Sequence, residues 1–220
     1  MKATGAIGTC VVTHNRLAYS RRCIESLYQN RRPGDQLVVV DNASDDGTVD
    51  WLHDFALRRG VKVIFNTDNR YPGAACNQGW DTLTTPLLHR SDNDIEYLPG
   101  WQNEVESQMV EGISLLGILN LHEDNGEPEP AEGVDFPDAV GGNVIIPAHL
   151  YSLLRWEEKP WGVLNFEDAA MSAIARQHGK VARLRKTVAN NMSFCRYDDY
   201  PDYYNRTAYL RGLSDARHSV

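Results

Sequence analysis

Short apolar runs rich in β-branched residues alternate with helical patterns along the first two thirds of this chain. The expected strands are 6–13, 36–41, 61–66, 86–94 and 112–119. The expected helices between them are 15–30, 47–60, 73–83 and 99–110. Parallel strands need a long crossover connection, which is usually a helix. The alternation therefore predicts an α/β fold, with a mostly parallel central sheet flanked by helices.

The last third of the chain has a different character. An acidic segment rich in proline and glycine predicts a long loop at 120–139. Further elements follow it: a strand at 140–147, a short helix at 148–154, a loop at 158–165, a helix at 166–179 and a strand at 180–189. No linker separates these elements from the rest, so we expect a single domain over 1–190 with halves at 1–98 and 99–190. A Tyr- and Arg-rich extension, 191–220, would pack on this domain.

Composition excludes several classes of protein. Hydrophobic residues make up 42% of the 220 residues and charged residues 24%, which is typical of soluble globular proteins. No run of roughly 20 apolar residues occurs, so no membrane span is expected. The first residues are typical of a strand and not of a signal peptide. The four cysteines form no C-x-x-C pair, which argues against a zinc site or a disulfide framework, and we expect a cytoplasmic protein. The net charge of −8 makes nucleic acid a less expected partner.

Carboxylates stand at the ends of two expected strands. Asp41 ends the apolar run in "VVVDNASDDGT" (38–48). Asp92 and Asp94 belong to "SDND" (91–94), which ends the expected strand 86–94. In α/β sheets, ligands bind beyond the carboxyl ends of the strands, so Asp41 is expected at a ligand site. Asp-Asn-Ala-Ser is also good turn chemistry, and a structural turn or helix cap stays open for Asp41.

Five segments in one order carry a resemblance to a known family. They are "VVTHNR" (11–16), "VVVDNASDDGT" (38–48), "NTDNRYPGAACNQGW" (66–80), "SDND" (91–94) and "FEDAAMSAIARQHG" (166–179). Together they resemble family 2 of the glycosyltransferases, nucleotide-sugar enzymes with the GT-A fold, over about residues 6–188. A D-x-D pair alone would be a weak signal, but five elements in order are specific. The resemblance implies a Rossmann-like sheet, with the donor bound by the half 1–98 and the acceptor by the half 99–190.

The resemblance assigns donor-binding roles to residues at the strand ends. The loop after the first strand would cradle the base and ribose, Asp41 would read the base through a ring N–H, and the start of the helix at 73–83 would approach the diphosphate. An internal hydrogen bond stays open as the alternative for Asn77. Cys76 stands where many family members carry arginine, which puts one phosphate contact in doubt. The implied donor-binding residues are Thr13, His14, Asn15, Arg16, Asp41, Asn42, Arg70, Gly73, Asn77 and Asp92.

A divalent cation is implied at the D-x-D element. Asp94 would be the main metal ligand and Asp92 would face the ribose and the metal, because carboxylate oxygens near a diphosphate suit Mn²⁺ or Mg²⁺. An exposed acidic turn is the alternative. The family's third ligand is often a histidine after the last strand, but "VANNMSFCRY" (188–197) has none. The third ligand therefore stays open between Asn190, Asn191, water and no ligand.

The acceptor side is implied by the segment "FED". Asp168 matches the general base that takes the proton from the acceptor hydroxyl, and Glu167 would bind an acceptor hydroxyl or act as the base. Trp161 is a candidate platform for the acceptor sugar, and Gly142 would leave space beside it. The alternatives are that the two acids favour the dipole of a helix's first turn and that Trp161 packs in the core.

The resemblance predicts an inverting, metal-dependent glycosyltransferase that uses a nucleotide-diphosphate sugar, with UDP-sugar favoured. The acceptor stays open among glycans, lipid-linked sugars, proteins and other hydroxyl compounds. One alternative is a sugar-1-phosphate nucleotidyltransferase, although the expected G-x-G-T-R loop is missing from "AIGTCVVTHNR" (6–16). The other alternative is a nucleotide-sugar-binding module without catalysis.

Overall fold

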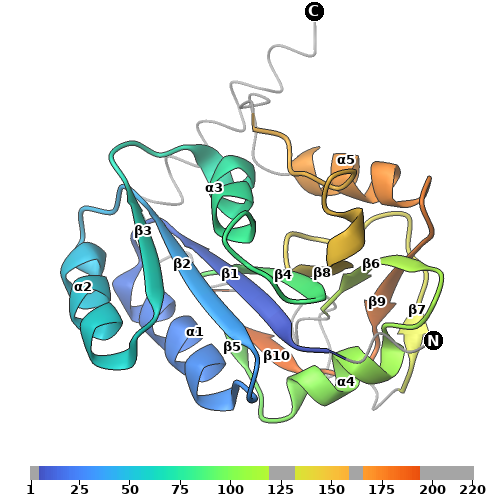
Figure 1. The fold of residues 1–220 in the computed structure, drawn as a ribbon, viewed down its shortest axis with the longest axis horizontal. Helices are drawn as coiled ribbons and strands as arrows, with labels where there is room; N and C mark the ends of the chain where they lie inside the picture. The colour runs from blue at the N-terminus through green and yellow to red at the C-terminus, as the bar shows by residue number, and fades with distance from the viewer. Residues whose placement is uncertain (1–4, 119–131, 159–165, 194–220) are drawn as a thin grey trace, which may run out of the picture.

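Eight strands form one central sheet in the computed structural model, which describes residues 5–118, 132–158 and 166–193 (Figure 1). β1, β2, β3, β4, β6 and β9 run in one direction, and β8 and β7 run in the other. The predicted α/β fold with a mostly parallel sheet in a single domain is confirmed. In order across the sheet, the strands are β3 (Lys62–Asn66), β2 (Gln36–Asn42), β1 (Ile7–Thr13), β4 (Leu87–Asp92), β8 (Val144–Pro147), β6 (Ile113–Gly117), β9 (Lys180–Leu184) and β7 (Val134–Asp135).

Helices cover both faces of the sheet, as Figure 1 shows. Alternate strand residues point to opposite faces: Val39 packs in the same cluster as α1, α2 and α4, whereas Val38 and Val40 pack with α3 and α5. Each face of the sheet therefore has its own apolar core, which explains the nearly continuous apolar runs of the strands. The helices are α1 (Leu17–Asn30), α2 (Thr48–Arg59), α3 (Tyr71–Trp80), α4 (Trp101–Gln108) and α5 (Phe166–Ala175), with a short 3₁₀ helix η1 (Ala148–Leu150).

Two predicted strands end earlier than expected, and a short additional strand follows each of them. The strand expected at 86–94 ends as β4 at Asp92, a turn follows at 93–94, and β5 (Ile95–Tyr97) begins after it. The strand expected at 180–189 ends at Leu184, and β10 (Ala189–Asn191) pairs antiparallel with β5 in a separate two-stranded sheet. Short strands of this kind depend on a distant partner and leave no periodic signal of their own.

Other boundaries differ by a few residues. The helix expected at 73–83 begins at Tyr71 and ends at Trp80, and the strand expected at 140–147 begins at Val144. β7 lies inside the expected loop at 120–139. The remainder of that loop at 120–131, the loop at 159–165 and the extension after 193 lie outside the described residues.

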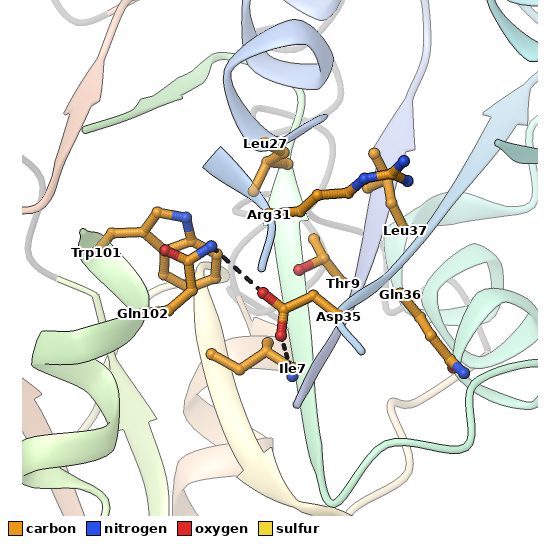
Figure 2. Close-up of a pocket in the computed structure, with 9 residues that line it drawn as sticks. All are labelled: Ile7, Thr9, Leu27, Arg31, Asp35, Gln36, Leu37, Trp101 and Gln102. Carbon is orange, nitrogen blue, oxygen red and sulfur yellow. Dashed lines mark hydrogen bonds between the residues drawn. The ribbon is translucent and has the colours of Figure 1, made fainter. Parts of the chain in front are cut away.

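The amino-terminal end of the sheet is closed by internal contacts of Asp35 (Figure 2). Its carboxylate accepts hydrogen bonds from the backbone N–H groups of Ile7, at 2.8 Å, and Arg32, at 2.9 Å. Arg32 is also ion-paired with Glu106, at 2.9 Å, on α4. The small hollow beside Asp35 is lined by side chains such as Leu37 and Trp101. These contacts tie the loop between α1 and β2 to β1 and to α4.

A buried polar network crosses the middle of the sheet at His89. The His89 ring contacts Thr9 Oγ1 through Nδ1, at 3.0 Å, and Asn143 Oδ1 through Nε2, at 2.8 Å. The Tyr97 hydroxyl donates to the same Asn143 oxygen, at 2.8 Å. Burial lowers the pKa of His89 to about 4, and the hydrogen bond with Asn143 opposes this shift. The imidazole is therefore neutral in the folded protein at neutral pH.

We expect His89 to make the fold sensitive to acid. Its pKa is about 6.5 when unfolded and about 4 when folded. The unfolded chain thus binds a proton first, and stability is lost as pH falls from 6.5 towards 4. Between these pH values the free energy of unfolding should drop by about 3 kcal/mol more in the wild type than in His89→Gln. Urea unfolding at several pH values measures this difference, and parallel curves for the two proteins would contradict it.

Candidate active site

The carboxyl ends of four parallel strands meet at one edge of the sheet. Thr13 at the end of β1 lies opposite Asp41 of β2, and Val12 lies opposite Asp92 of β4. Asn42 in turn lies opposite Asn66, the last residue of β3. The pairing therefore brings the predicted donor-side segments together at this edge, where α/β folds bind ligands.

The loops after β1 and β2 are tied to one another. His14 Nδ1 contacts the Asn42 carbonyl oxygen at 2.9 Å, and the Asn15 N–H donates to Ser44 Oγ at 2.8 Å. The Asp41 carboxylate accepts from the Ser44 N–H, at 3.0 Å, and from the Ser44 hydroxyl, at 2.6 Å, and Asp41 is fully buried. These are the contacts of the structural turn left open for Asp41. Its role in reading a base stays a prediction.

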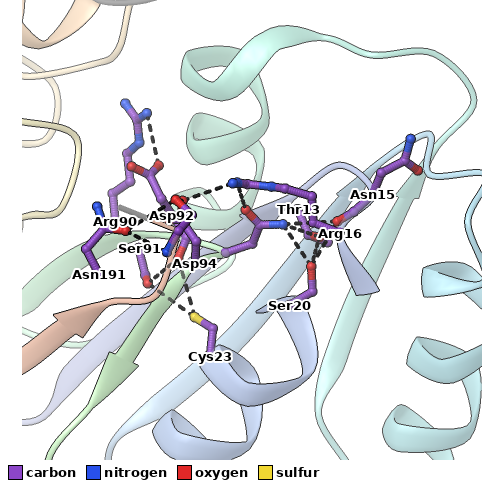
Figure 3. A network of polar contacts seen from close by, with 12 residues as sticks. Thr13, Asn15, Arg16, Ser20, Cys23, Arg90, Ser91, Asp92, Asp94 and Asn191 are labelled. Carbon is purple, nitrogen blue, oxygen red and sulfur yellow. Dashed lines mark hydrogen bonds and ion pairs between the residues drawn. The ribbon is translucent and has the colours of Figure 1, made fainter. Parts of the chain in front are cut away.

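Arg16 points from the β1 loop towards the D-x-D element (Figure 3). Its Nη1 is 3.0 Å from Asp94 Oδ2, and its Nη2 donates to Asn93 Oδ1. Asn93 donates in turn to Thr13 Oγ1, at 3.2 Å. Thr13, Arg16 and Asn93 are all buried. This contact set orients Asp94, while contact of Thr13 and Arg16 with a base or ribose stays a prediction.

Ser193 is the side chain that the β10 segment brings to Asp94. Its hydroxyl donates to Asp94 Oδ2 at 2.6 Å, and the Met192 N–H donates to the Asp94 carbonyl at 2.8 Å. Asn191, a candidate third ligand, instead accepts from the Ser193 N–H at 3.1 Å through its side-chain oxygen. The Asn190 side-chain oxygen is buried without a hydrogen-bond partner. Sequence reasoning missed Ser193, because only the β5–β10 pairing places it beside Asp94.

The first turns of α3 pack against the segment 156–158. The Asn77 amide donates to the Trp156 carbonyl at 2.9 Å and accepts from the Trp156 N–H at 3.0 Å. A Cβ built on Gly73 would lie 2.4 Å from the Glu157 carbonyl oxygen, so only glycine permits this close approach. Asn77 thus makes the internal hydrogen bonds that were the alternative to donor binding. Arg70 is exposed at this edge, and its backbone N–H donates to Asn42 Oδ1 at 3.1 Å.

A buried arginine joins the donor-side and acceptor-side acids. The Arg90 side chain is 3% exposed, and its Nη2 lies 3.4 Å from Asp92 Oδ1 and 3.3 Å from Glu167 Oε1. Its Nη1 lies 3.6 Å from Asp168 Oδ1. The guanidinium carbon lies 4.1 Å from the ring centroid of Trp156. Carboxylates of β4 and α5 therefore meet at one guanidinium.

This grouping of charges shifts the pKa values of its members. Burial raises the pKa of Asp168 to about 7; Arg90 opposes the shift, and Asp92 and Glu167 add to it. Burial also raises the pKa of Asp92; Asp94 and Glu167 add to the shift and Arg90 opposes it, although 40% of the Asp92 side chain is exposed. Burial disfavours the charge of Arg90, but the acids around it raise its pKa above the ordinary value. Asp168 therefore changes charge near neutral pH, which suits a general base.

Gly142 leaves the space that the Arg90 ion pairs need. A Cβ at Gly142 would lie 3.0 Å from Arg90 Nη2 and 3.1 Å from Asp92 Oδ2. The predicted platform, Trp161, lies outside the described residues, so its role stays a prediction. Arg90 and Trp156 were missed from sequence, although an arginine inside the apolar run "LLHRSD" (87–92) is a detectable signal.

Comparison with known proteins identifies the family and the fold of the chain. The family model described as Glycosyl transferase family 2 matches residues 9–118, which is half of the chain. This chain belongs to glycosyl transferase family 2. The matched region includes the D-x-D element and the loops after β1, β2 and β3. No curated protein matches the chain.

Solved structures with a similar fold include S. aureus TarS, with a TM-score of 0.67 and 17% identity, covering 85% of this chain and 36% of that one. GalNAc-T7 with UDP, GalNAc and Mn²⁺ has a TM-score of 0.70 and 13% identity. The match covers 87% of this chain and 44% of GalNAc-T7. The mannosyltransferase PcManGT from Pyrobaculum calidifontis, with GDP-Man and Mn²⁺, has a TM-score of 0.65 and 16% identity. The match covers 81% of this chain and 56% of PcManGT. The family 2 chain thus spans between about a third and somewhat over half of these proteins. At these identities the likeness shows the GT-A fold.

The acids of this family 2 site fit a divalent cation that is shared with a diphosphate. When all are ionised, Asp92, Asp94, Glu167 and Asp168 carry four negative charges, and Arg16 and Arg90 carry two positive charges. The group therefore keeps an excess of negative charge, which favours binding of a cation. Within the described ranges, no three His, Cys, Asp or Glu side chains form a ligand cluster. Mg²⁺ is often held by one or two carboxylates together with substrate phosphates, and the partly exposed Asp92 suits that role.

Among the helices of the described residues, none is long and apolar enough to cross a membrane.

We expect Asn77→Ala to destabilise the protein through Trp156. The substitution leaves the buried N–H and carbonyl of Trp156 without their partners, which should lower the free energy of unfolding by about 2–3 kcal/mol. Gln78→Ala is the control, because Gln78 exchanges hydrogen bonds with Asn66 and not with Trp156. Thermal or urea unfolding measures the loss. An unchanged stability together with weaker nucleotide binding would instead indicate a direct ligand contact by Asn77.

Proposed function

We propose that this family 2 chain is an inverting, metal-dependent glycosyltransferase that moves a sugar from a UDP-sugar to an acceptor hydroxyl. The observation that carries the proposal is the contact of one guanidinium, that of Arg90, with both Asp92 and Asp168. An acid at the end of β4 and an acid in the first turn of α5 thereby share one site. Inversion requires such a pair, with the leaving group on one side of the anomeric carbon and the base on the other.

On the donor side, the loops after β1 and β2 would hold the base and ribose, and exposed Arg70 would reach the diphosphate. Asp92 and Asp94 would hold Mn²⁺ or Mg²⁺. When bound, the ion would offset the negative charge of the leaving nucleoside diphosphate. Arg16 and Ser193 orient Asp94 through its Oδ2 atom.

On the acceptor side, Asp168 would take the proton from the attacking hydroxyl. A carboxylate is a weak base at its ordinary pKa, and burial brings the pKa of Asp168 to about 7. Proton transfer is efficient when the pKa of the base lies near the working pH. Glu167, held by Arg90 at 3.3 Å, would bind a neighbouring hydroxyl of the acceptor.

The donor and the acceptor class need a direct test. Support for UDP comes from similar folds: GalNAc-T7 was solved with UDP, and TarS 1–349 with UDP and with UDP-GlcNAc. PcManGT with GDP-Man is the counter-example. A thermal-shift screen of UDP-glucose, UDP-galactose, UDP-GlcNAc, dTDP-rhamnose and GDP-mannose with Mn²⁺ should identify the donor. The acceptor is a glycan, a lipid-linked sugar, a protein or another hydroxyl compound, and the identified donor allows these classes to be assayed.

A binding module without catalysis is the second candidate. It is favoured by one observation, namely that Asp94 Oδ2 already accepts from Arg16 and Ser193. Binding of UDP-sugars without any hydrolysis or transfer would support the module and exclude the enzyme.

We expect Asp168→Asn to abolish transfer while nucleotide binding persists. The amide cannot accept the proton, and loss of a general base typically lowers kcat by about 10²–10⁴-fold. In the wild type, kcat/KM should rise with pH through about 7, because the carboxylate must be ionised to act as a base. Initial rates from pH 5 to 9 and a UDP titration measure both effects. Near-normal turnover by the variant would exclude Asp168 as the base.

We expect EDTA to stop transfer and Mn²⁺ to restore it. Asp92→Asn should weaken Mn²⁺-dependent UDP binding, because Asp92 is the more exposed of the two D-x-D carboxylates, at 40% against 13%. Calorimetric titration of UDP with and without Mn²⁺ measures the coupling between metal and nucleotide. Full activity in chelator would remove the metal from the mechanism.

A further inference from the structure

We propose that Arg90 is a positioning residue of the transfer reaction, which fixes the acids of α5 against the end of β4. The inference rests on the proposed function. It assigns to one buried side chain the relative placement of the donor-side acid Asp92 and the acceptor-side acids Glu167 and Asp168. The Arg90 side chain is only 3% exposed, so it is too deeply buried to bind a ligand directly.

The first turn of α5 is joined to the sheet through Arg90. The two acids of this turn lie 3.3 Å and 3.6 Å from its guanidinium nitrogens. The rest of α5 is attached by different groups: the Ser114 hydroxyl donates to the Ala175 carbonyl at 2.8 Å, and the Val140 N–H donates to Ser172 Oγ at 3.2 Å. Loss of the Arg90 contacts would therefore release the catalytic turn without detaching the whole helix.

Arg90 itself is held rigidly, so it can serve as a reference point. Its backbone is in β4, which is hydrogen-bonded to β1 and β8 on either side. Its guanidinium lies over the Trp156 ring at 4.1 Å. Trp156 is fixed in turn by the two hydrogen bonds of its backbone with Asn77 of α3. The positions of the acids thus depend on a continuous set of contacts from α3 through Trp156 and Arg90 to α5.

The geometry requires a guanidinium and not merely a positive charge. Two terminal nitrogens of one planar group reach three carboxylates that come from two elements. A lysine ammonium is a point charge on a flexible chain and cannot span these positions at once. Arg90→Lys therefore keeps the charge of the site but loses the fixed spacing.

The first test compares Arg90→Lys with Arg32→Lys. Arg32 is the control, because it also pairs with two acids, Asp35 of its own loop and Glu106 of α4, but at the opposite end of the sheet. With the UDP-sugar chosen by the thermal-shift screen, and Mn²⁺, we expect Arg90→Lys to lower kcat by about 10–100-fold. The KM for the donor and the dissociation constant for UDP should stay within about threefold, because the α5 acids do not hold the nucleotide and the backbone of Asp92 stays paired with β1. Arg32→Lys should keep the wild-type kcat.

The second test moves the guanidinium without changing any charge. Gly142→Ala places a methyl group 3.0 Å from Arg90 Nη2 and 3.1 Å from Asp92 Oδ2, so both members of this ion pair must shift by a few tenths of an ångström. Gly141→Ala is the control, because no atom of the described residues lies within 4 Å of a Cβ at that position. We expect Gly142→Ala to lower kcat severalfold and Gly141→Ala to have no effect. This pair keeps the inference testable if Arg90→Lys fails to fold.

The outcomes separate this inference from the proposed function. A lowered kcat with unchanged UDP affinity in Arg90→Lys or Gly142→Ala supports positioning by Arg90. An active wild type, together with normal kcat in both variants, overturns the role of Arg90 and leaves the proposed function intact. Equal losses of kcat and UDP affinity would show a general structural role and would also overturn it. A wild type that binds UDP-sugars but never releases UDP refutes the proposed function, and this inference with it.

Discussion

The ion pairs of one buried arginine determine how the two sides of this site are related. Carboxylates gathered at the end of a sheet repel one another, and burial makes each of them costly to ionise. Arg90 attracts the carboxylates of Asp92, Glu167 and Asp168 at once and so opposes the repulsion among them. A buried charge cluster of this kind adds little net stability. Its value here is geometric, because the acids come from separate elements that are held at one cation.

The remainder of the site is organised before any ligand arrives. Thr13, Arg16, Asn42 and Asn77 are buried and hydrogen-bonded within the protein. Their contacts tie the loops after β1, β2 and β3 to the turn that carries Asp94 and to the segment that carries Trp156. Such internal pairing reduces the ordering that binding must otherwise impose on loops. The family resemblance assigned several of these residues to direct ligand contact, whereas their described contacts hold the surroundings in place.

The sequence predicted the features that depend on local pattern. Alternating apolar runs and helices indicated the parallel sheet, and the ordered segments around Asp41, Asp94 and Asp168 indicated the family and the edge where these acids lie. The features it did not predict depend on distant partners. Ser193 reaches Asp94 through the pairing of β5 with β10, and Asn77 meets Trp156 across 79 residues of chain. Arg90 was visible as a charge in an apolar strand, but its three acidic neighbours become apparent only in three dimensions.

If the proposed function is correct, the hydrogen bonds that Ser44 donates to Asp41 have a consequence for selectivity among nucleobases. Ser44 occupies two of the roughly four acceptor positions of this carboxylate, so a base that offers a ring N–H would add a hydrogen bond to those already present. A base that turns a ring lone pair towards the same oxygen would meet repulsion instead. Discrimination at this position would therefore combine a bond to suitable bases with exclusion of unsuitable ones.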